Sequence, residues 1–199
     1  MAHYFDEQPG VASDRRMVDV ALADIAFTLA TDRGVFSHGH VDTGTGLLLR
    51  EAPAPAPSGH LLDLGCGSGP VAITLALRSP AATVWAVDTN ERARALTAHN
   101  AERNGLTNVR ACAPSEVPAD ISFDTIWSNP PIRIGKTALH DLLSGWLGRL
   151  TADGTAVLVV QKHLGADSLE RWLNEHVLPT RRIASRAGFR LLESSRRHG

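Results

Sequence analysis

The fold is decided by residues 61–73, which read Leu-Leu-Asp-Leu-Gly-Cys-Gly-Ser-Gly-Pro-Val-Ala-Ile. A short apolar run with an acid is followed by a glycine-rich turn, and an apolar-periodic segment opens behind the turn. This pattern predicts a buried strand, a tight loop and the start of a helix. Because glycine lacks a Cβ, such a loop lets a ligand approach the bare main chain. The unpaired N–H groups and the positive dipole end of the following helix suit a carboxylate or a phosphate.

The spacing of the glycines indicates which ligand this loop binds. A dinucleotide-binding fingerprint, Gly-x-Gly-x-x-Gly, would place its third glycine where Pro70 stands, and proline cannot replace that glycine in close helix–strand packing. The glycines after Asp63 are instead at 65, 67 and 69, so the stretch resembles the first motif of class I S-adenosylmethionine (SAM) methyltransferases; an ordinary glycine-rich turn is the alternative. In that family the loop wraps the methionine half of SAM and the acid lies close to it. The resemblance implies cofactor contacts for Asp63, Gly65, Cys66, Gly67 and Gly69.

The composition is that of a globular domain. The chain has 199 residues, of which 43% are hydrophobic and 21% charged, enough for one full core. It has no apolar run of 18 residues, and residues 1–20 carry acids in place of a hydrophobic signal core. We therefore expect a cytoplasmic protein that does not associate with a membrane.

The cysteines and histidines predict no metal site. Cys66 and Cys112 lack metal-binding spacing, and we expect both thiols to be reduced and packed. His38 and His40 lie close together, but no nearby acid or cysteine completes a set of ligands. We therefore expect no bound metal.

The net charge of −1 hides an asymmetry along the chain. Residues 162–199 hold Lys162 and seven arginines against four acids, a balance of +4, which leaves −5 for the remaining chain. The net charge argues against a generally basic nucleic-acid binder, yet a local basic patch can still steer an RNA backbone. The alternative is a solvated tail in a chain that prefers arginine, since only two of its 20 basic residues are lysines.

The segment before the glycine loop predicts a hairpin. Apolar and polar residues partly alternate over 18–29, which favours two short antiparallel strands that turn near Ala23-Asp24 and add to the core sheet. A helix over 19–29 is the competing interpretation, because alanine is frequent there.

A helix carrying Leu47-Leu48-Leu49 is expected next, capped by Asp42, Thr43 or Thr45. Residues 52–59, alternating alanines and prolines followed by Ser58-Gly59, are expected to form a stiff connector. We therefore divide the chain into an N-terminal hairpin and capping segment, 1–58, and one compact catalytic domain, 59–199.

Strands and helices alternate from Leu61 onward. This rhythm requires an α/β fold with a doubly wound, mostly parallel sheet of seven strands, with ligands at the carboxyl ends of the strands. The expected strands are 61–64, 83–87, 109–112, 123–128, 155–161, 182–186 and 189–193. The expected helices are about 70–79, 90–104, 137–150 and 167–175, the third ending before Asp153-Gly154.

Asp88 ends the second of these strands, 25 residues after Asp63. A carboxylate there can accept hydrogen bonds from both ribose hydroxyls of an adenosine-bearing cofactor. NAD enzymes use the same arrangement, so Asp88 does not discriminate between the cofactors, and a cap for the next helix is the alternative role. Thr89 and Asn90 are expected beside the adenosine, and Ser115 near the adenine edge.

Asn129-Pro130-Pro131-Ile132 closes the fourth strand and indicates the chemistry. An amine conjugated to a ring or carbonyl is a poor nucleophile, because its lone pair is delocalised. The Asn129 oxygen and the Pro130 carbonyl can both accept from such an NH2 group and aim its lone pair at the methyl of the adjacent cofactor, so positioning replaces a strong base. The two prolines fix φ and end the strand, so their carbonyls face the pocket. A simple strand-ending turn is the alternative.

These features together resemble amino-directed N-methyltransferases, which act on adenine or guanine amines or on a glutamine of a release factor. The segment Gly34-Val35-Phe36-Ser37, followed by Val41-Asp42-Thr43-Gly44-Thr45 and Leu47-Leu48-Leu49, resembles the lead-in of the "methyltransferase small" domain. That domain occurs in bacterial ribosomal RNA guanine-N2 methyltransferases. The resemblance runs from about Thr31 to Val160 and implies a SAM-binding, Rossmann-like domain with Thr45 near the cofactor pocket.

The chain departs from that family in two ways. An aromatic residue that stacks on the flipped base usually follows Asn-Pro-Pro, and stacking contributes ~1–3 kcal/mol per base. Here Ile132 stands in that place, with Phe36, Trp127 or Trp146 as candidates to compensate. The proteobacterial small-subunit enzymes also carry a degenerate second copy of the domain, and these 199 residues hold one copy. RNA docking would then rest on the N-terminal hairpin, Arg133, Lys136 or the arginine-rich C-terminus.

The resemblance leads us to expect a SAM-dependent N-methyltransferase acting on the exocyclic N2 amine of a guanine in ribosomal RNA, free or in an assembling subunit. One alternative substrate is a protein glutamine or a small-molecule amine, and a SAM-binding RNA assembly factor with little turnover is a further alternative. The oligomeric state is open, with a monomer favoured. Catalytic roles are expected for Asn129, Pro130 and Pro131, and substrate contacts for Phe36, Ile132, Arg133 and Lys136.

Overall fold

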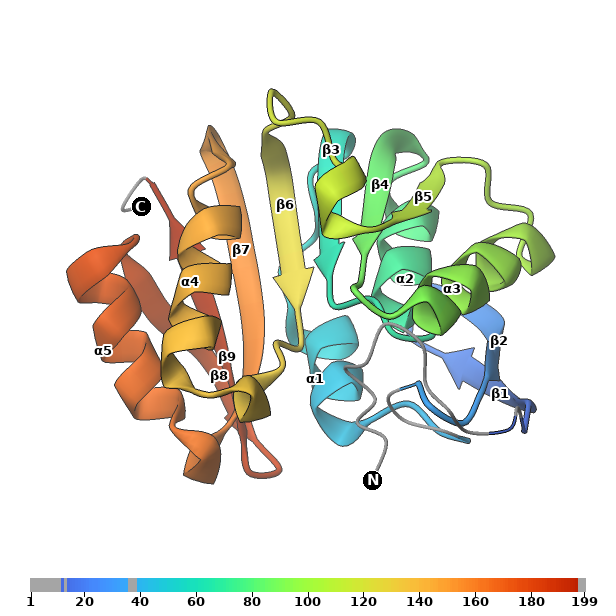
Figure 1. The fold of residues 1–199 in the computed structure, drawn as a ribbon, viewed down its shortest axis with the longest axis horizontal. Coiled ribbons are helices and arrows are strands. Elements are labelled where there is room, and N and C mark those ends of the chain that lie inside the picture. Colours follow the sequence, from blue (N-terminus) through green and yellow to red (C-terminus); the bar gives the residue numbers. More distant parts are fainter. Residues whose placement is uncertain (1–11, 13, 36–38, 197–199) are drawn as a thin grey trace.

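The computed structural model describes residues 12, 14–35 and 39–196 and is organised around one large sheet (Figure 1). Five neighbouring strands are parallel, and the sixth runs antiparallel to both of its neighbours. The predicted doubly wound, mostly parallel sheet of seven strands is therefore confirmed. In spatial order the strands are β5 (Val109–Cys112), β4 (Ala81–Val87), β3 (Ser58–Leu64), β6 (Phe123–Ser128), β7 (Leu150–Gln161), β9 (Phe189–Ser195) and β8 (Thr180–Arg186).

Helices cover both faces of this sheet (Figure 1). Successive residues of a strand point to opposite faces, so Leu192 of β9 packs into one apolar core and Leu191 into the other. Each core is closed by a pair of helices that carry leucines toward the sheet. The pairs are α4 (Lys136–Leu147) with α5 (Ala166–His176), and α1 (Thr43–Glu51) with α2 (Pro70–Arg78).

The predicted N-terminal hairpin is present, and the competing helix over 19–29 is absent. Its strands are β1 (Arg16–Ala21) and β2 (Ala26–Thr31). The two strands form a sheet of their own, and neither pairs with a strand of the large sheet within the described residues. The expectation that the hairpin adds to the core sheet is therefore wrong.

The hairpin is held by α3 (Glu91–Arg103) in place of a neighbouring strand. The Asn100 side chain accepts from the Ala30 N–H (2.7 Å) and donates to the Ala30 carbonyl (2.8 Å). Asn104, at the C-cap of α3, makes the same pair of bonds with Thr28 at 3.3 and 2.9 Å. Asn100 and Asn104 lie four residues apart on the same side of α3, and their partners Ala30 and Thr28 lie two residues apart on β2. The two amides thus provide hydrogen-bond partners for backbone groups at the edge of β2 that none of the described strands pairs with.

The helix expected to reach residue 150 is shorter. α4 ends at Leu147, and β7 begins soon after, so Asp153 and Gly154 lie inside the strand rather than before it. The pairing of β6 with β7 shifts register between Phe123 and Thr125, which absorbs the additional residues of β7. A Cβ on Gly154 would lie 2.7 Å from the Phe123 carbonyl oxygen, so glycine is required where these two main chains meet.

Three short 3-10 turns gather at the carboxyl edge of the parallel strands. Each turn directly follows one of these strands. They therefore lie at the edge where a doubly wound sheet binds its ligand. The turns are η1 (Pro114–Glu116), η2 (Ile132–Ile134) and η3 (Lys162–Leu164).

The arginines of the C-terminal strands do not form a bare basic patch. Their guanidinium groups meet carboxylates of the same chain, so the local positive balance is compensated at the surface. The ion pairs are Arg181–Glu193 (2.7 Å), Arg182–Glu170 (3.0 Å) and Arg186–Glu51 (3.3 Å).

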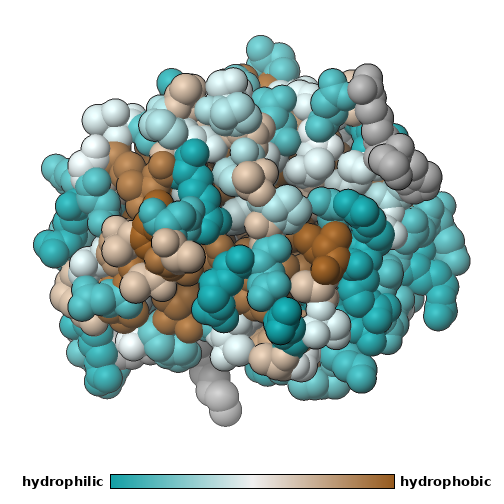
Figure 2. Space-filling model, turned by 180° about the vertical axis from the view of Figure 1, so that it is seen from behind, coloured by the Kyte–Doolittle hydropathy of each residue, from teal (hydrophilic) through white to brown (hydrophobic). Residues whose placement is uncertain are grey.

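The rear surface is mixed in polarity. Figure 2 shows apolar patches there, separated by hydrophilic side chains. Among the described residues, no helix is both long and apolar enough to span a bilayer.

Candidate active site

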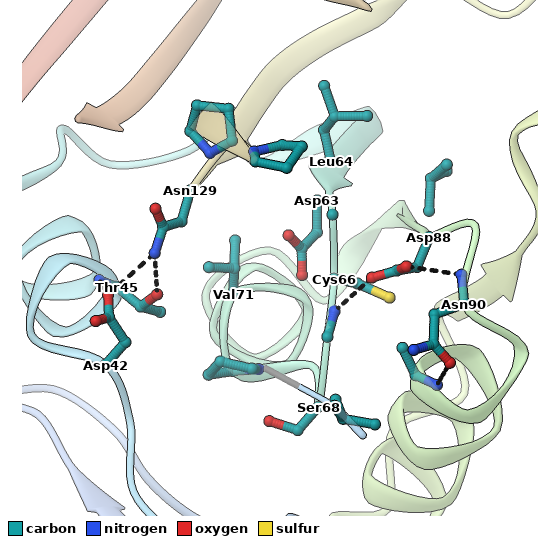
Figure 3. Close-up of a pocket in the computed structure, with 18 of the residues that line it drawn as sticks. Asp42, Thr45, Asp63, Leu64, Cys66, Ser68, Val71, Asp88, Asn90 and Asn129 are labelled. Atoms are coloured by element: carbon teal, nitrogen blue, oxygen red, sulfur yellow. Dashed lines mark hydrogen bonds between the residues drawn. The ribbon is translucent and has the colours of Figure 1, made fainter. Parts of the chain in front are cut away.

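A cavity of about 470 Å³ lies at the carboxyl edge of the large sheet. The glycine loop after β3 forms one part of its wall, and the Asn129 motif after β6 forms another (Figure 3). Residues that are far apart in the sequence therefore meet in one place. The predicted site residues that line the cavity are Thr45, Asp63, Gly65, Cys66, Gly67, Asp88, Thr89, Asn90, Asn129, Pro130, Pro131, Ile132 and Arg133.

Among the described residues, three of the predicted site residues do not line this cavity. Gly69 faces α3, because a Cβ on it would lie 2.9 Å from Thr97 Cγ2. Ser115 is exposed on η1, and its neighbour Pro114 reaches the cavity instead. Lys136 is exposed at the first residue of α4. Glycine at position 69 therefore allows the loop to pack closely against α3.

The glycine loop leaves its main chain open to a ligand. The φ angle is +81° at Gly65 and +56° at Gly67, a region that other residues adopt only with strain. The N–H groups of Gly65 and Cys66 donate to the Val87 carbonyl at 2.8 and 3.1 Å, which ties the loop to β4. No atom lies within 4 Å of a Cβ placed on Gly65. A ligand can therefore approach the backbone directly at this point.

Two residues of α3 fix this loop from behind, and sequence reasoning missed both. Thr97 Oγ1 donates to the Gly67 carbonyl (3.0 Å), and Asn100 Nδ2 donates to the Ser68 carbonyl (2.8 Å). Both side chains are fully buried. Because they are three residues apart, the sequence predicts that they share one face of the helix. The spacing does not predict that this face contacts the glycine loop.

Asp63 is enclosed beneath the glycine loop, with 2% of its surface exposed. Its Oδ2 accepts from the Ala72 N–H in the first turn of α2 (2.9 Å). Burial raises the pKa of Asp63 to about 8, although the Ala72 hydrogen bond opposes this, and the charge of Asp88 adds to the rise. A cationic ligand near this carboxyl would favour its charged form.

Asp88 shapes the loop and faces the cavity (Figure 3). Its Oδ2 accepts from the Gly67 N–H (3.0 Å) and its Oδ1 from the Asn90 N–H (2.9 Å). Burial raises the pKa of Asp88, and these two bonds and the Arg94 guanidinium oppose the rise. Each oxygen retains a lone pair for a further donor, since an ionised carboxylate has about four acceptor sites. The helix cap falls to Asn90, whose Oδ1 accepts from the Ala93 N–H (3.2 Å).

The Asn129 amide is held from the side of α1 (Figure 3). Its Nδ2 donates to Asp42 Oδ2 and to Thr45 Oγ1, each at 3.0 Å. Both N–H bonds of the amide are thereby used, and Oδ1 is left to accept a bond from a ligand. Asp42 is also the cap of α1, because its Oδ2 accepts from the Thr45 N–H (3.0 Å). Sequence reasoning found the cap but missed the bond to Asn129.

A tight turn follows Asn129, and its residues Pro130 and Pro131 line the cavity. Pro131 has φ −75° and ψ 74°, and the Ile132 N–H donates to the Pro130 oxygen at 2.8 Å. These values describe an inverse γ-turn. A carbonyl oxygen has two lone pairs, so one of them remains for a substrate N–H.

Aromatic candidates for the missing stacking ring differ in position. Trp127 is 1% exposed in the core, whereas Trp146 lines the cavity. Phe36 lies outside the described residues. Phe189, at the start of β9, also lines the cavity and was not anticipated. Trp146 and Phe189 are therefore the rings that join Ile132 on the cavity wall.

Cys66 lines the cavity as a packed thiol. Burial raises its pKa well above the usual value, and its sulfur lies 3.4 Å from Thr97 Oγ1. Cys66 and Cys112 are both free. Across the described residues, no group of three or more His, Cys, Asp or Glu side chains is arranged to hold a metal ion.

Comparisons with known proteins match nearly the whole chain. The protein YbxB of Bacillus subtilis (strain 168), named as uncharacterized, is 35% identical over 98% of both chains. The ribosomal RNA small subunit methyltransferase C of Ectopseudomonas mendocina is 32% identical over 94% of this chain and 57% of its own length. The chain thus spans little more than half of that relative.

A solved structure has a closely similar fold. It is the T. thermophilus 16S rRNA N2 G1207 methyltransferase RsmC in complex with AdoMet and guanosine. The TM-score is 0.78 and the sequence identity 24%, and the match covers 95% of this chain and 52% of that chain. The family model of the Methyltransferase small domain matches residues 26–193. This range includes the glycine loop, Asp88 and Asn129. The predicted fold, enzyme class and SAM cofactor are thereby confirmed. The chain belongs to the methyltransferase small domain family of class I SAM-dependent methyltransferases.

Proposed function

We propose that this enzyme transfers a methyl group from SAM to the exocyclic N2 amine of a guanine in ribosomal RNA. The observation that carries the proposal is the Asn129 amide, whose two N–H bonds are taken up by Asp42 and Thr45. Its oxygen is therefore suited to accept from an NH2 group such as that of guanine. The relatives named ribosomal RNA small subunit methyltransferase C, and the solved structure that holds guanosine, support the same class of substrate.

The residues of the cavity fit SAM, which supplies an electrophilic methyl group when bound. Gly65 offers open main chain, and Asp88 retains acceptor capacity for the ribose hydroxyls. The buried Asp63 carboxyl suits a cationic sulfonium. We assign cofactor contacts to Asp63, Gly65, Cys66, Gly67, Asp88, Thr89, Asn90, Thr45 and Asn129.

The amine of guanine is conjugated with its ring and must be oriented before it can attack. Asn129 Oδ1 and the Pro130 carbonyl accept from its two N–H groups, which turns the nitrogen lone pair toward the methyl. Ile132 supplies apolar contact to the base, and Trp146 and Phe189 line the same cavity. A guanine paired within RNA would have to be extruded to reach this depth.

Exposed basic residues at and beside the cavity are assigned to the RNA backbone. Arg133 is exposed where it lines the cavity, and Lys136 is exposed three residues later. We expect their charges to contact phosphates next to an extruded base. The expected partner is ribosomal RNA, free or in an assembling subunit.

The test is transfer of tritium from labelled SAM to ribosomal RNA and to small-subunit particles taken from cells that lack this protein. We expect label in N2-methylguanosine, identified by nucleoside mass analysis, and none with Asn129→Ala protein that still binds SAM in calorimetry. Label on protein alone, or on another nucleoside, would overturn the assignment of substrate. A comparison of free RNA with particles shows which form is recognised.

A further inference from the structure

One carboxylate oxygen joins the N-terminal helix to the catalytic motif. Asp42 Oδ2 accepts from the Thr45 N–H at 3.0 Å, as the cap of α1, and from Asn129 Nδ2 at 3.0 Å. The Thr45 hydroxyl receives the second N–H of the same amide, also at 3.0 Å. These three side chains form a closed set on the cavity wall (Figure 3).

The two partners of the amide differ in what they can enforce. A threonine hydroxyl can donate or accept, so it would satisfy either orientation of the Asn129 amide. An ionised carboxylate can only accept, so it would repel the amide oxygen if the group were turned over. Asp42 is therefore the partner that decides which end of the amide faces the cavity.

We propose that Asp42 is a positioning residue that fixes the Asn129 amide with its oxygen toward the cavity, so that the site presents an acceptor to the N–H donors of the substrate. This inference rests on the proposed function for its substrate. An inverted amide would present its own NH2 to the NH2 of the substrate, and two donors cannot bond to each other. The N-terminal segment thus contributes to the catalytic geometry and not only to the cover of the sheet.

Variants at residue 42 can separate this role from the helix cap. Serine and asparagine are both good N-cap residues, so each should preserve α1. Only asparagine has an acceptor oxygen that reaches as far as that of Asp42 and can serve both Thr45 N–H and Asn129. If Asp42 is only a cap, Asp42→Ser and Asp42→Asn should behave alike. If Asp42 positions Asn129, asparagine should recover activity that serine does not.

The kinetic arm compares these variants on the RNA used above. We expect Asp42→Ser to lower kcat roughly 10- to 100-fold, less than removal of a catalytic donor can cause, with unchanged SAM affinity and thermal unfolding. Asp42→Asn should regain most of this loss. Asp19→Ser is the control, because it makes the same replacement at an aspartate on the hairpin, where Asp19 accepts from the Thr28 hydroxyl (3.0 Å). Equal kcat in wild type and Asp42→Ser, or equal loss in both variants, would overturn the inference.

A spectroscopic arm needs no substrate. The side-chain NH2 of Asn129, assigned by its loss in Asn129→Ala, should exchange slowly with solvent in the wild-type proton–nitrogen correlation spectrum. It should exchange faster in Asp42→Ser but not in Asp19→Ser. Unchanged exchange in Asp42→Ser would overturn the role of Asp42 even where methyl transfer to guanine is observed. Protected wild-type exchange without guanine methylation would defeat the proposed function and leave the orientation of the amide established.

Discussion

The two halves of the cavity are built in opposite ways. On the half proposed to bind the cofactor, here called the cofactor half, Asp88, Thr97 and Asn100 hold the glycine loop through buried or half-buried hydrogen bonds. On the half proposed to bind the substrate, here called the substrate half, Arg133 is exposed and, within the part of the chain that the structure describes, makes no side-chain hydrogen bond. Leu164 on the neighbouring η3 turn is 38% exposed.

The contrast teaches which ligand each half is adapted to. A small cofactor gains affinity from a cradle that is ordered before binding, because little entropy is then lost in the complex. A large RNA brings its own structure and phosphates, so a rim of unengaged cations and apolar side chains can suffice. Mutations in the cofactor half are therefore expected to lower the affinity for SAM or the stability of the fold. Mutations in the substrate half are expected to lower the affinity for RNA.

The largest effect is expected when the cofactor half is broken at Asp88. Asp88→Ala removes the acceptors for the ribose and frees the Gly67 N–H, so the SAM Kd should rise about 10- to 100-fold, or about 1–3 kcal/mol. Isothermal calorimetry measures this change. Arg133→Ala is the control from the substrate half and should leave SAM affinity unchanged. Unaltered SAM binding in Asp88→Ala would remove Asp88 from the cofactor site.

A second test divides the glycine loop itself. Gly69→Ala should lower the free energy of unfolding by about 2 kcal/mol or more, since the strain of φ +88° is joined by a contact with Thr97. Gly65→Ala meets no neighbouring atom, so only the strain of about 1–2 kcal/mol remains. Urea unfolding compares the two variants. Equal destabilisation would contradict the packing role assigned to Gly69.

A third test uses the burial of Asp63. Its folded pKa of about 8 exceeds the ordinary value of 3.8, so between these values the folded state holds a proton that the unfolded state has released. Stability of the SAM-free protein should therefore fall as pH rises through this window and level off above about pH 8. Asp63→Asn keeps an oxygen for the Ala72 N–H but has no ionisable group at this position. The Tm of the variant should therefore rise relative to the Tm of wild type as the pH increases. Thermal unfolding curves that stay parallel from about pH 5 to about pH 8 would contradict this account.

The smallest effect is expected on the substrate half. Arg133→Ala and Lys136→Ala should each weaken RNA binding a few-fold at low salt and reduce the slope of log K against log salt by about one. Arg181→Ala, which removes an ion-paired arginine on β8, is the matched control. Salt titrations followed by fluorescence anisotropy measure the slope. A slope equal to that of wild type would show that the mutated side chain contacts no phosphate.

The sequence by itself determined the features that are written into neighbouring residues. The glycine spacing at 65–69, the acid at Asp88 and the Asn129-Pro130-Pro131 motif each occupy a short stretch at the end of a strand. Hydrophobic periodicity then sets the order of strands and helices, and the handedness of crossovers brings the strand ends to one edge. The fold class, the family and most of the cavity wall could therefore be predicted without coordinates.

Only the tertiary structure decided which side chains meet across large separations in the chain. Asp42 reaches Asn129 over 87 residues, and Gly69 turns to Thr97 rather than to the cavity. No local pattern encodes such pairs, because each depends on how two elements pack in three dimensions. Glycine spacing and periodicity act within one element and thus predict where the cofactor binds, whereas the orientation of the Asn129 amide is fixed by contacts between elements.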